Sequence, residues 1–431
     1  MIRAMLLAWV VGFAAAGCVT YTGPIVRSNE ARIYGIEEVL ARDEVTEVDV
    51  LMIHGMCTHG RQWVQKSFNR LGERTGFIDA ELDLAEVKKN ELVLSARFTP
   101  GDILPGREEM PKGLEEIEHT AIYSHKFEKD GKTLWVHAIL WSPSTEPLKK
   151  RLCYDITDRK SADGKKCQDA PAYPYKRASL NARFKDKLMN NCLSDVFIYL
   201  GENQKIIQKQ VAMAIVYAAG VRSADSASWD PIIKRAREET TPVFIVAESL
   251  GCKVLFDTLV AMYTESIGRG DLIDEILESN STSEKERNGV EKEKLVEAIE
   301  NFFNRTEQIY LGGNQIPVLS LANESSFRDL VKNSRYPKNG GILNPKGGHP
   351  LPVAVFSDPN DILSYTFGYS GFGDITGISA VDVIVSNGRT WFGLFEWPGS
   401  AHEGYRDNPW VDEIIRCGYP RWRDCPEPPE N

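Results

Sequence analysis

The segment 243–258, VFIVAESLGCKVLFDT, holds a serine in a setting suited to nucleophilic catalysis. In Ala247-Glu248-Ser249-Leu250-Gly251, small residues stand two positions before and two positions after Ser249. This spacing is typical of a sharp strand-to-helix turn, where a strained backbone exposes the serine hydroxyl above a sheet. Apolar β-formers precede the turn and an apolar-faced helical pattern follows it. Ser249 is therefore the candidate nucleophile, and a serine at an ordinary helix N-cap is the alternative.

A serine nucleophile needs a base to take its proton, and that base needs a carboxylate to orient it. His402, in the small-residue sequence GSAHEGY, is the only histidine that follows the candidate acids, and we predict it to be the base. The segment 353–365, VAVFSDPNDILSY, places two aspartates just past an expected strand. Asp361, which precedes an apolar pair, is the predicted acid. Asp358 is the alternative, and otherwise it is expected to make the turn.

Acyl transfer builds negative charge on a carbonyl oxygen, which two backbone N–H groups must stabilise. We expect one from Leu250, directly after the candidate nucleophile. The sequence His54-Gly55-Met56 follows an expected strand, and Met56 is the predicted second donor. His54 is then expected to hold the loop, or to be a plain buried histidine. Glu248 is expected to hydrogen-bond within the turn, although a role in tuning the site stays open.

These residues must be positioned by strands that alternate with helices. Lys129-Asp130-Gly131 predicts a hairpin turn, and 184–216 and 253–263 have helical patterns. Such alternation predicts an α/β fold with a mostly parallel sheet covered by helices on both faces. The expected strands are Val48–Ile53, Leu92–Phe98, Ile122–Phe127, Thr133–Trp141, Val243–Val246, Ile316–Ala322, Val353–Phe356 and Val381–Val385.

Four motifs together resemble the α/β-hydrolase superfamily, in particular the serine esterase and lipase group that includes the PGAP-type deacylases. They are LMIHGMCTHG (51–60), VAESLG (246–251), VFSDPNDILSY (355–365) and AHEGY (401–405). The resemblance implies an α/β-hydrolase fold and hydrolysis of carboxylic esters, including lipid esters, through an acyl-enzyme on Ser249. It implies no metal and no organic cofactor. The sequence departs from the family pattern at Ala247, where glycine is usual.

Two other functions stay open at this level. The same three residues would serve acyl transfer to an alcohol or a glycan instead of water. A catalytically inactive protein that uses the fold as a binding surface in the cell envelope is the third hypothesis. The sequence leaves the oligomeric state open.

The first residues predict export. Residues 1–17 combine a positive start, an uncharged apolar run and small residues, as in a signal peptide. The run is too short to span a bilayer. The sequence AAGC resembles a bacterial lipobox, which implies that Cys18 carries a lipid and anchors the protein to a membrane. An ordinary signal peptide is the alternative. By the same resemblance, we expect the protein at the periplasmic face of the outer membrane.

Composition limits the remaining possibilities. The chain has 431 residues and a formal net charge of −10, which argues against nucleic acid as a partner. After an anchor or linker at 18–45, we expect one α/β domain over 46–425. Polar excursions interrupt it at 143–176 and at 278–294, and a polar tail covers 426–431. The second excursion is expected to be a solvated loop between helices.

An exported protein meets oxidising conditions, so its cysteines can pair. Cys153 with Cys167, and Cys417 with Cys425, would close short polar loops and are the predicted disulfides. Cys57 and Cys252 lie beside the candidate site in sequence. Each is expected to be a small buried apolar residue rather than a reactive thiol.

Overall fold

The fold is described from a computed structural model, which covers most of the chain. The described residues are 21–27, 32–77, 82–89, 91–94, 120–158, 167, 173–220, 229–266, 272, 289–323, 350–368, 378–391 and 394–425. The predicted signal peptide, the predicted lipid attachment at Cys18 and the tail 426–431 lie outside them. Within the described part of the chain, no helix combines the length and the apolar character that crossing a membrane requires.

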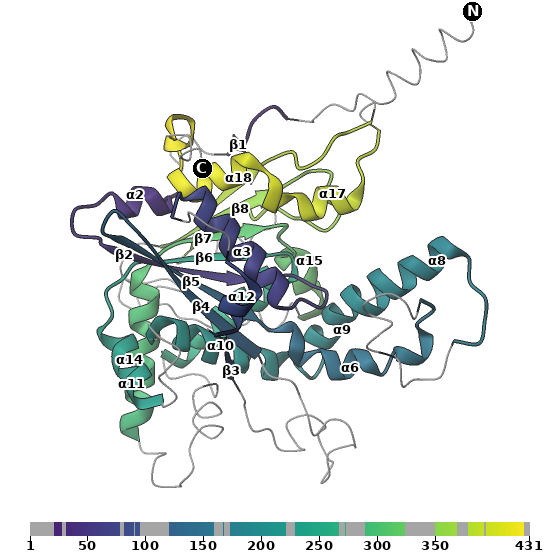
Figure 1. The fold of residues 1–431 in the computed structure, drawn as a ribbon, viewed down its shortest axis with the longest axis horizontal. Helices are drawn as coiled ribbons and strands as arrows, with labels where there is room; N and C mark the ends of the chain where they lie inside the picture. Colours follow the sequence, from purple (N-terminus) through teal and green to yellow (C-terminus); the bar gives the residue numbers. More distant parts are fainter. Residues whose placement is uncertain are drawn as a thin grey trace, which may run out of the picture.

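A mostly parallel sheet forms the centre of the described structure (Figure 1). Its order is β1-β9-β8-β7-β6-β2-β5-β4-β3. Neighbours pair in parallel from β9 through β5, while β1, β4 and β3 pair antiparallel with their neighbours. The strands are β1 Ile25–Val26, β2 Glu47–Ile53, β3 Glu91–Leu94, β4 Thr120–Lys129, β5 Lys132–Leu140, β6 Val243–Glu248, β7 Thr306–Gly312, β8 Leu351–Ser357 and β9 Ile378–Ile384.

Helices cover both faces of the sheet, which explains why central strands such as β2 and β6 are mostly apolar. One face packs against α10 Gln204–Gly220, α11 Trp229–Glu238, α12 Leu250–Ser266 and α14 Gly289–Arg305. The other packs against α2 Ile36–Leu40, α3 Arg61–Arg74 and α18 Pro409–Cys417. Each face has its own hydrophobic core. The predicted mixed α/β architecture with a mostly parallel sheet is confirmed.

Shorter elements complete the described structure. They are α4 Leu84–Lys89, α6 Glu146–Lys150, α8 Ser179–Arg183, the π-helix η3 Phe184–Leu193, α9 Ser194–Leu200, α15 Ile316–Ser320, α17 Pro398–Glu403, and the 3₁₀ turns η1 Ser142–Ser144, η2 Cys153–Asp155, η5 Leu321–Asn323, η7 Gly404–Asp407 and η8 Arg421–Asp424. Helices α6, α8 and α9 project from the sheet (Figure 1).

The carboxyl ends of the parallel strands lie at one edge of the sheet. The order in which strands are added switches there from one side of β2 to the other. From β2 the next parallel strand is β5 on one side, whereas β6 pairs with the other side of β2. Such a switch point opens a crevice at the carboxyl ends of the strands, which is where α/β proteins bind ligands. His54 follows β2 and Ser249 follows β6, so the two candidate segments flank this crevice.

Most predicted strands are present, but one prediction is wrong. Ile316–Ala322 was expected to be a strand, and it forms α15 and η5 instead, with Pro317 in the first helical turn. Proline is favoured at a helix start, and a short apolar run alone does not distinguish the two structures. Two strands, β1 and β7, were not predicted. Leu92–Phe98 corresponds to β3, with residues 95–98 outside the described part.

Other local predictions have clear outcomes. The hairpin of β4 and β5 turns at Asp130 and Gly131, both with positive φ, as predicted. The predicted loop at 278–294 is wrong for residues 289–294, which begin α14, while 278–288 lie outside the described residues. The predicted disulfides Cys153–Cys167 and Cys417–Cys425 are present.

Candidate active site

Ser249 lies in the turn between β6 and α12, with a backbone φ of 52°. Positive φ is rare for residues with a side chain, so the turn is strained, and its N–H donates to the carbonyl of Gly312 at 2.8 Å. Packing around the turn admits only small residues. A Cβ at Gly251 would lie 2.3 Å from the carbonyl oxygen of His54, and one at Gly55 would lie 2.7 Å from the Cβ of Ser249. The sequence-predicted strand-to-helix turn is thus present.

His402 lies in the last turn of α17 and contacts both of its predicted partners. Its Nε2 is 2.8 Å from Oγ of Ser249, and its Nδ1 is 2.9 Å from Oδ2 of Asp361. Its side chain is 15% exposed, whereas that of Asp361 is fully buried. The structure therefore brings together three side chains that are far apart in the sequence, in the geometry of a nucleophile, a base and an orienting acid.

The carboxylate of Asp361 is held by two further donors. The backbone N–H of Leu363 donates to Oδ1 at 3.0 Å, and the hydroxyl of Tyr405 donates to Oδ2 at 3.0 Å. Burial raises the pKa of Tyr405 well above its usual value, so the phenol stays protonated as a donor. Tyr405 was not singled out from the sequence, although it ends the motif AHEGY.

Asp358, the alternative acid, instead accepts hydrogen bonds from the loops near His402. It accepts the N–H of Asn360 at 2.9 Å and the N–H of Asn387 at 2.6 Å. The side chain of Asn387 in turn donates to the carbonyl of Ala401, next to the base, at 2.7 Å. Burial raises the pKa of the Asp358 carboxyl. These contacts fit the turn-making role that the sequence suggested for it.

On the opposite side of the nucleophile, His54 fixes the loop that follows β2. Its ring is fully buried and stacks on Trp141, with centroids 5.0 Å apart. Its Nε2 accepts the backbone N–H of Trp141 at 3.1 Å and that of Ser142 at 3.2 Å. Burial lowers the pKa of His54 well below its usual value, so the ring is neutral and can accept. His54 thus has the structural role that was expected of it.

The predicted oxyanion donors are both buried beside Ser249. Met56 is 7% exposed and Leu250 is fully buried at the first position of α12. Among the hydrogen bonds of the described residues, none is donated by the N–H of Met56. An unpaired N–H next to a nucleophile is available to a developing oxyanion.

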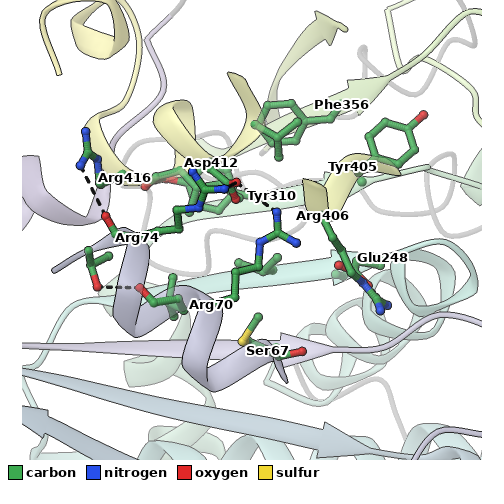
Figure 2. Close-up of a pocket in the computed structure, with 18 residues that line it drawn as sticks. Ser67, Arg70, Arg74, Glu248, Tyr310, Phe356, Tyr405, Arg406, Asp412 and Arg416 are labelled. Carbon is green, nitrogen blue, oxygen red and sulfur yellow. Dashed lines mark hydrogen bonds and ion pairs between the residues drawn. The ribbon is translucent and has the colours of Figure 1, made fainter. Parts of the chain in front are cut away.

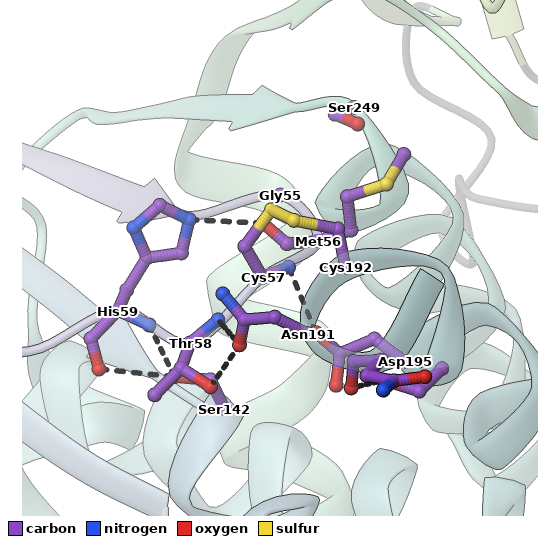
Figure 3. Close-up of a disulfide and its surroundings, with 12 residues drawn as sticks. Gly55, Met56, Cys57, Thr58, His59, Ser142, Asn191, Cys192, Asp195 and Ser249 are labelled. Carbon is purple, nitrogen blue, oxygen red and sulfur yellow. Dashed lines mark hydrogen bonds between the residues drawn. A yellow bond between two sulfur atoms is a disulfide. The ribbon is translucent and has the colours of Figure 1, made fainter. Parts of the chain in front are cut away.

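The loop after Met56 is tied to the projecting helical segment (Figure 3). Cys57, with φ 80°, forms a disulfide with Cys192 of η3, so the expectation of a plain buried residue is wrong. Its N–H donates to Asp195 at 2.8 Å, and Lys149 donates to the same carboxylate at 2.7 Å. Asn191 accepts the hydroxyl of Thr58 at 2.8 Å. Cys252, by contrast, is buried and unpaired with another cysteine, as expected.

Gln315 is a site residue that sequence reasoning missed. It precedes α15, is 2% exposed, and its Nε2 lies 3.0 Å from Oγ of Ser249. A serine hydroxyl has one hydrogen, which here points to His402, so Oγ accepts from the Gln315 amide. The nucleophile oxygen therefore has two side-chain partners.

Glu248 faces away from the nucleophile. Its carboxylate accepts from the guanidinium of Arg406, so the expectation of a bond within the turn is wrong. The pair borders a recess of about 740 Å³, partly open to solvent, between α3, α18 and the sheet (Figure 2). Neither Ser249 nor His402 lines this recess, which therefore lies behind the candidate site.

The described residues contain one group of three potential metal ligands, formed by Glu37, Cys417 and Cys425. The two cysteines are bonded to each other, so their sulfurs are not thiolates and the group lacks the donors that a metal requires. It lies apart from Ser249, on the α18 face of the sheet.

Comparison with known proteins gives no relative: no family model, no curated protein and no solved structure matches this chain.

Proposed function

We propose that the protein is a serine hydrolase of the α/β-hydrolase type, which cleaves carboxylic esters through an acyl-enzyme on Ser249. The observation that carries the proposal is the hydrogen-bonded path from Ser249 through His402 to Asp361, with distances of 2.8 and 2.9 Å. A serine held at positive φ between a strand and a helix, beside a switch point of a mostly parallel sheet, supports the same architecture.

In the first half-reaction, His402 Nε2 removes the hydroxyl proton as Oγ of Ser249 bonds to the ester carbonyl carbon. Asp361 accepts the Nδ1–H and stabilises the imidazolium that forms. The carbonyl oxygen becomes negative, and the N–H groups of Met56 and Leu250 stabilise it, each by roughly 3 kcal/mol. His402 then gives the proton to the departing alcohol, and the acyl group remains on Ser249.

In the second half-reaction, water replaces the alcohol. His402 takes a proton from the water as its oxygen attacks the acyl carbon. The same N–H groups hold the second oxyanion. Collapse of this intermediate releases the carboxylic acid, and His402 returns the proton to Oγ of Ser249. The proton transfers between Ser249 and His402 use a hydrogen bond that exists before substrate binds.

The proposed location at a membrane limits the class of substrates that we expect. If Cys18 carries a lipid, the enzyme acts at a membrane surface, where lipid esters and lipid-linked esters are its substrates. This assignment depends on the N-terminal sequence, not on the site. The site itself requires only a carboxylic ester.

The test is hydrolysis of p-nitrophenyl esters of graded acyl length by the wild type and Ser249→Ala. The expected result is turnover by the wild type and a loss of roughly 10⁶-fold in the variant. Ser67→Ala is the matched control, because Ser67 is as buried as Ser249 but lies on α3. Turnover that survives in Ser249→Ala, or a folded wild type that cleaves no ester, would refute the proposal.

A further inference from the structure

Exposed apolar side chains gather at the edge of the sheet that carries the candidate site. Half of the fourteen large apolar side chains that are exposed in the described structure follow the carboxyl ends of β7, β8 and β9. Four of these seven belong to one loop between β9 and α17. They are Trp391, Leu394, Phe395 and Trp397, exposed by 41%, 88%, 52% and 65%; the others are Leu321, Ile362 and Tyr365.

Two backbone hydrogen bonds join the described residues that carry these side chains. The N–H of Trp391 donates to the carbonyl of Phe395 at 2.7 Å, and the N–H of Leu394 donates to the carbonyl of Trp391 at 3.0 Å. The rings of Phe395 and Trp397 pack edge to face, with centroids 6.4 Å apart. Helix α17, with His402, begins at Pro398. The exposed apolar loop thus directly precedes the helix that carries the proposed base.

The charge of this loop differs from that of the whole protein. The chain carries a net charge of −10, but the loop residues 385–397 include only one acid, Glu396, which is 6% exposed and accepts from Asn360. Arg389 is exposed. The surface of the loop therefore combines tryptophan rings with a cation. This combination suits the headgroup region of a bilayer, where aromatic rings lie at the interface and arginine reaches phosphate.

The sheet register gives the direction of the N-terminal chain. Strand β1 pairs antiparallel with β9, with Ile25 opposite Ile384, the last residue of β9. Because the two strands run in opposite directions, the residues before Ile25 leave the sheet at its carboxyl edge. The N-terminal chain and the apolar loop thus start from one place.

Cys18, the predicted lipid attachment, is seven residues before Ile25. Seven residues span at most about 25 Å, which is shorter than the body of a domain of this size. An anchor at Cys18 would therefore keep the carboxyl edge of the sheet near the membrane. The opposite edge could not face the membrane without turning the chain back over the domain.

We infer that Trp391, Leu394, Phe395 and Trp397 rest on the surface of a phospholipid bilayer and turn the edge with Ser249 toward it. Membrane binding by this loop does not depend on the proposed function. Only the identity of the substrate, an ester in the bilayer, rests on the proposed function. Ester groups in the bilayer would reach Ser249 from the side on which the loop docks.

The test is quenching of tryptophan fluorescence by brominated acyl chains. The full chain is reconstituted on vesicles of brominated phosphatidylcholine and phosphatidylglycerol in equal amounts. The wild type is expected to be quenched. The double variant Trp391→Phe with Trp397→Phe keeps an apolar loop but loses the quenched emission. Trp410→Phe with Trp422→Phe is the matched control, because these two rings pack against each other at α18 and η8, and it keeps the quenching.

A substitution that places a negative charge in the apolar loop tests whether the loop contacts the bilayer. Leu394→Asp is expected to lower the quenching and to weaken binding to the same vesicles by about tenfold. Leu84→Asp, at an exposed leucine of α4, should change neither. Quenching that persists without Trp391 and Trp397 would overturn the inference. So would a self-association in solution that Leu394→Asp abolishes, because the loop would then bind a second copy. Neither readout depends on ester hydrolysis, so the proposed function can fail while this inference stands.

Discussion

The two sides of Ser249 are held by different means. On the side of β2, a disulfide, a buried ion pair and a stacked histidine fix the loop of Met56. On the side of β8 and β9, hydrogen bonds of Asp358, Asn387 and Tyr405 hold the segments of the proposed acid and base. An oxyanion donor must not move during the reaction, whereas the base must gain and lose a proton. The covalent bond between Cys57 and Cys192 therefore lies on the side of the proposed oxyanion donor Met56.

Substitution of the two aspartates on the β8 side, Asp361 and Asp358, should lower kcat by very different factors. Asp361→Asn is expected to lower kcat by about 10⁴-fold, because an amide neither fixes the same imidazole tautomer nor stabilises the imidazolium. Asp358→Asn, one hydrogen bond further from the base, should lower it only about tenfold. Steady-state ester hydrolysis measures both, with circular dichroism to verify folding. Equal losses would mean that Asp358 shares the role of acid.

The disulfide on the β2 side should matter for catalysis as well as for stability. Cys57→Ser with Cys192→Ser is expected to lower kcat by about 10²-fold, because the Met56 N–H is then less well placed. It should also lower the free energy of unfolding by about 4 kcal/mol, since the bond spans 135 residues.

Cys417→Ser with Cys425→Ser is the control, because that bond spans only 8 residues and lies away from Ser249. It should cost less stability and leave kcat near the wild-type value. An unchanged kcat in the Cys57 and Cys192 pair, measured below the unfolding transition, would remove the disulfide from the account of the oxyanion site.

Gln315 should affect the second half-reaction more than the first. Its N–H on Oγ withdraws electrons from the acyl-serine ester and stabilises Oγ as it departs, but it also weakens the attacking hydroxyl. Gln315→Met should therefore slow deacylation by about tenfold and lower kcat and KM together. The measurement is the burst with p-nitrophenyl acetate, which should grow in the variant.

Gln308→Met is a suitable comparison, because Gln308 is an equally buried glutamine of β7 that bonds to Tyr34 instead. A fall in kcat/KM without accumulation of acyl-enzyme would assign Gln315 a merely structural role.

Acid should lower the free energy of unfolding through His59, on the β2 side, without a direct effect on the proposed catalytic residues. Burial lowers the pKa of His59 to about 4, from about 6.5 when exposed. The unfolded chain therefore binds the proton more tightly. The stabilising contribution is complete above pH 6.5 and falls as the pH decreases toward 4, by roughly 3 kcal/mol. His59→Gln, whose amide can still donate to the carbonyl of Met56, should reduce this pH dependence in urea unfolding. An identical slope in the variant would contradict the assignment.

How far the sequence predicted the site depends on how local each signal was. The turn at Ser249 and the HG loop after β2 are local patterns. The order of Ser249, Asp361 and His402 follows from the resemblance to a known family, and the structure brings these residues together. The pairing of Cys57 with Cys192 has no local signal, because 135 residues separate them. Gln315 acts on Ser249 only because β6 and β7 are neighbours, and β7 itself was not predicted.

The errors in the fold have a similar origin. The run at 316–322 is apolar in either structure, and the proline that starts α15 was the one sign of a helix. Glu248 was assigned to its own turn, but its partner Arg406 is 158 positions away. Local sequence predicts which residues can react, whereas the contacts that orient them depend on how the strands are arranged.

The most direct test of the central claim is to map where a fluorophosphonate probe attaches to the wild-type protein. We expect a single adduct, found by peptide mass spectrometry on Ser249, and a much lower rate of labelling in His402→Ala. An adduct on another residue, or a labelling rate that does not change when His402 is replaced, would contradict it.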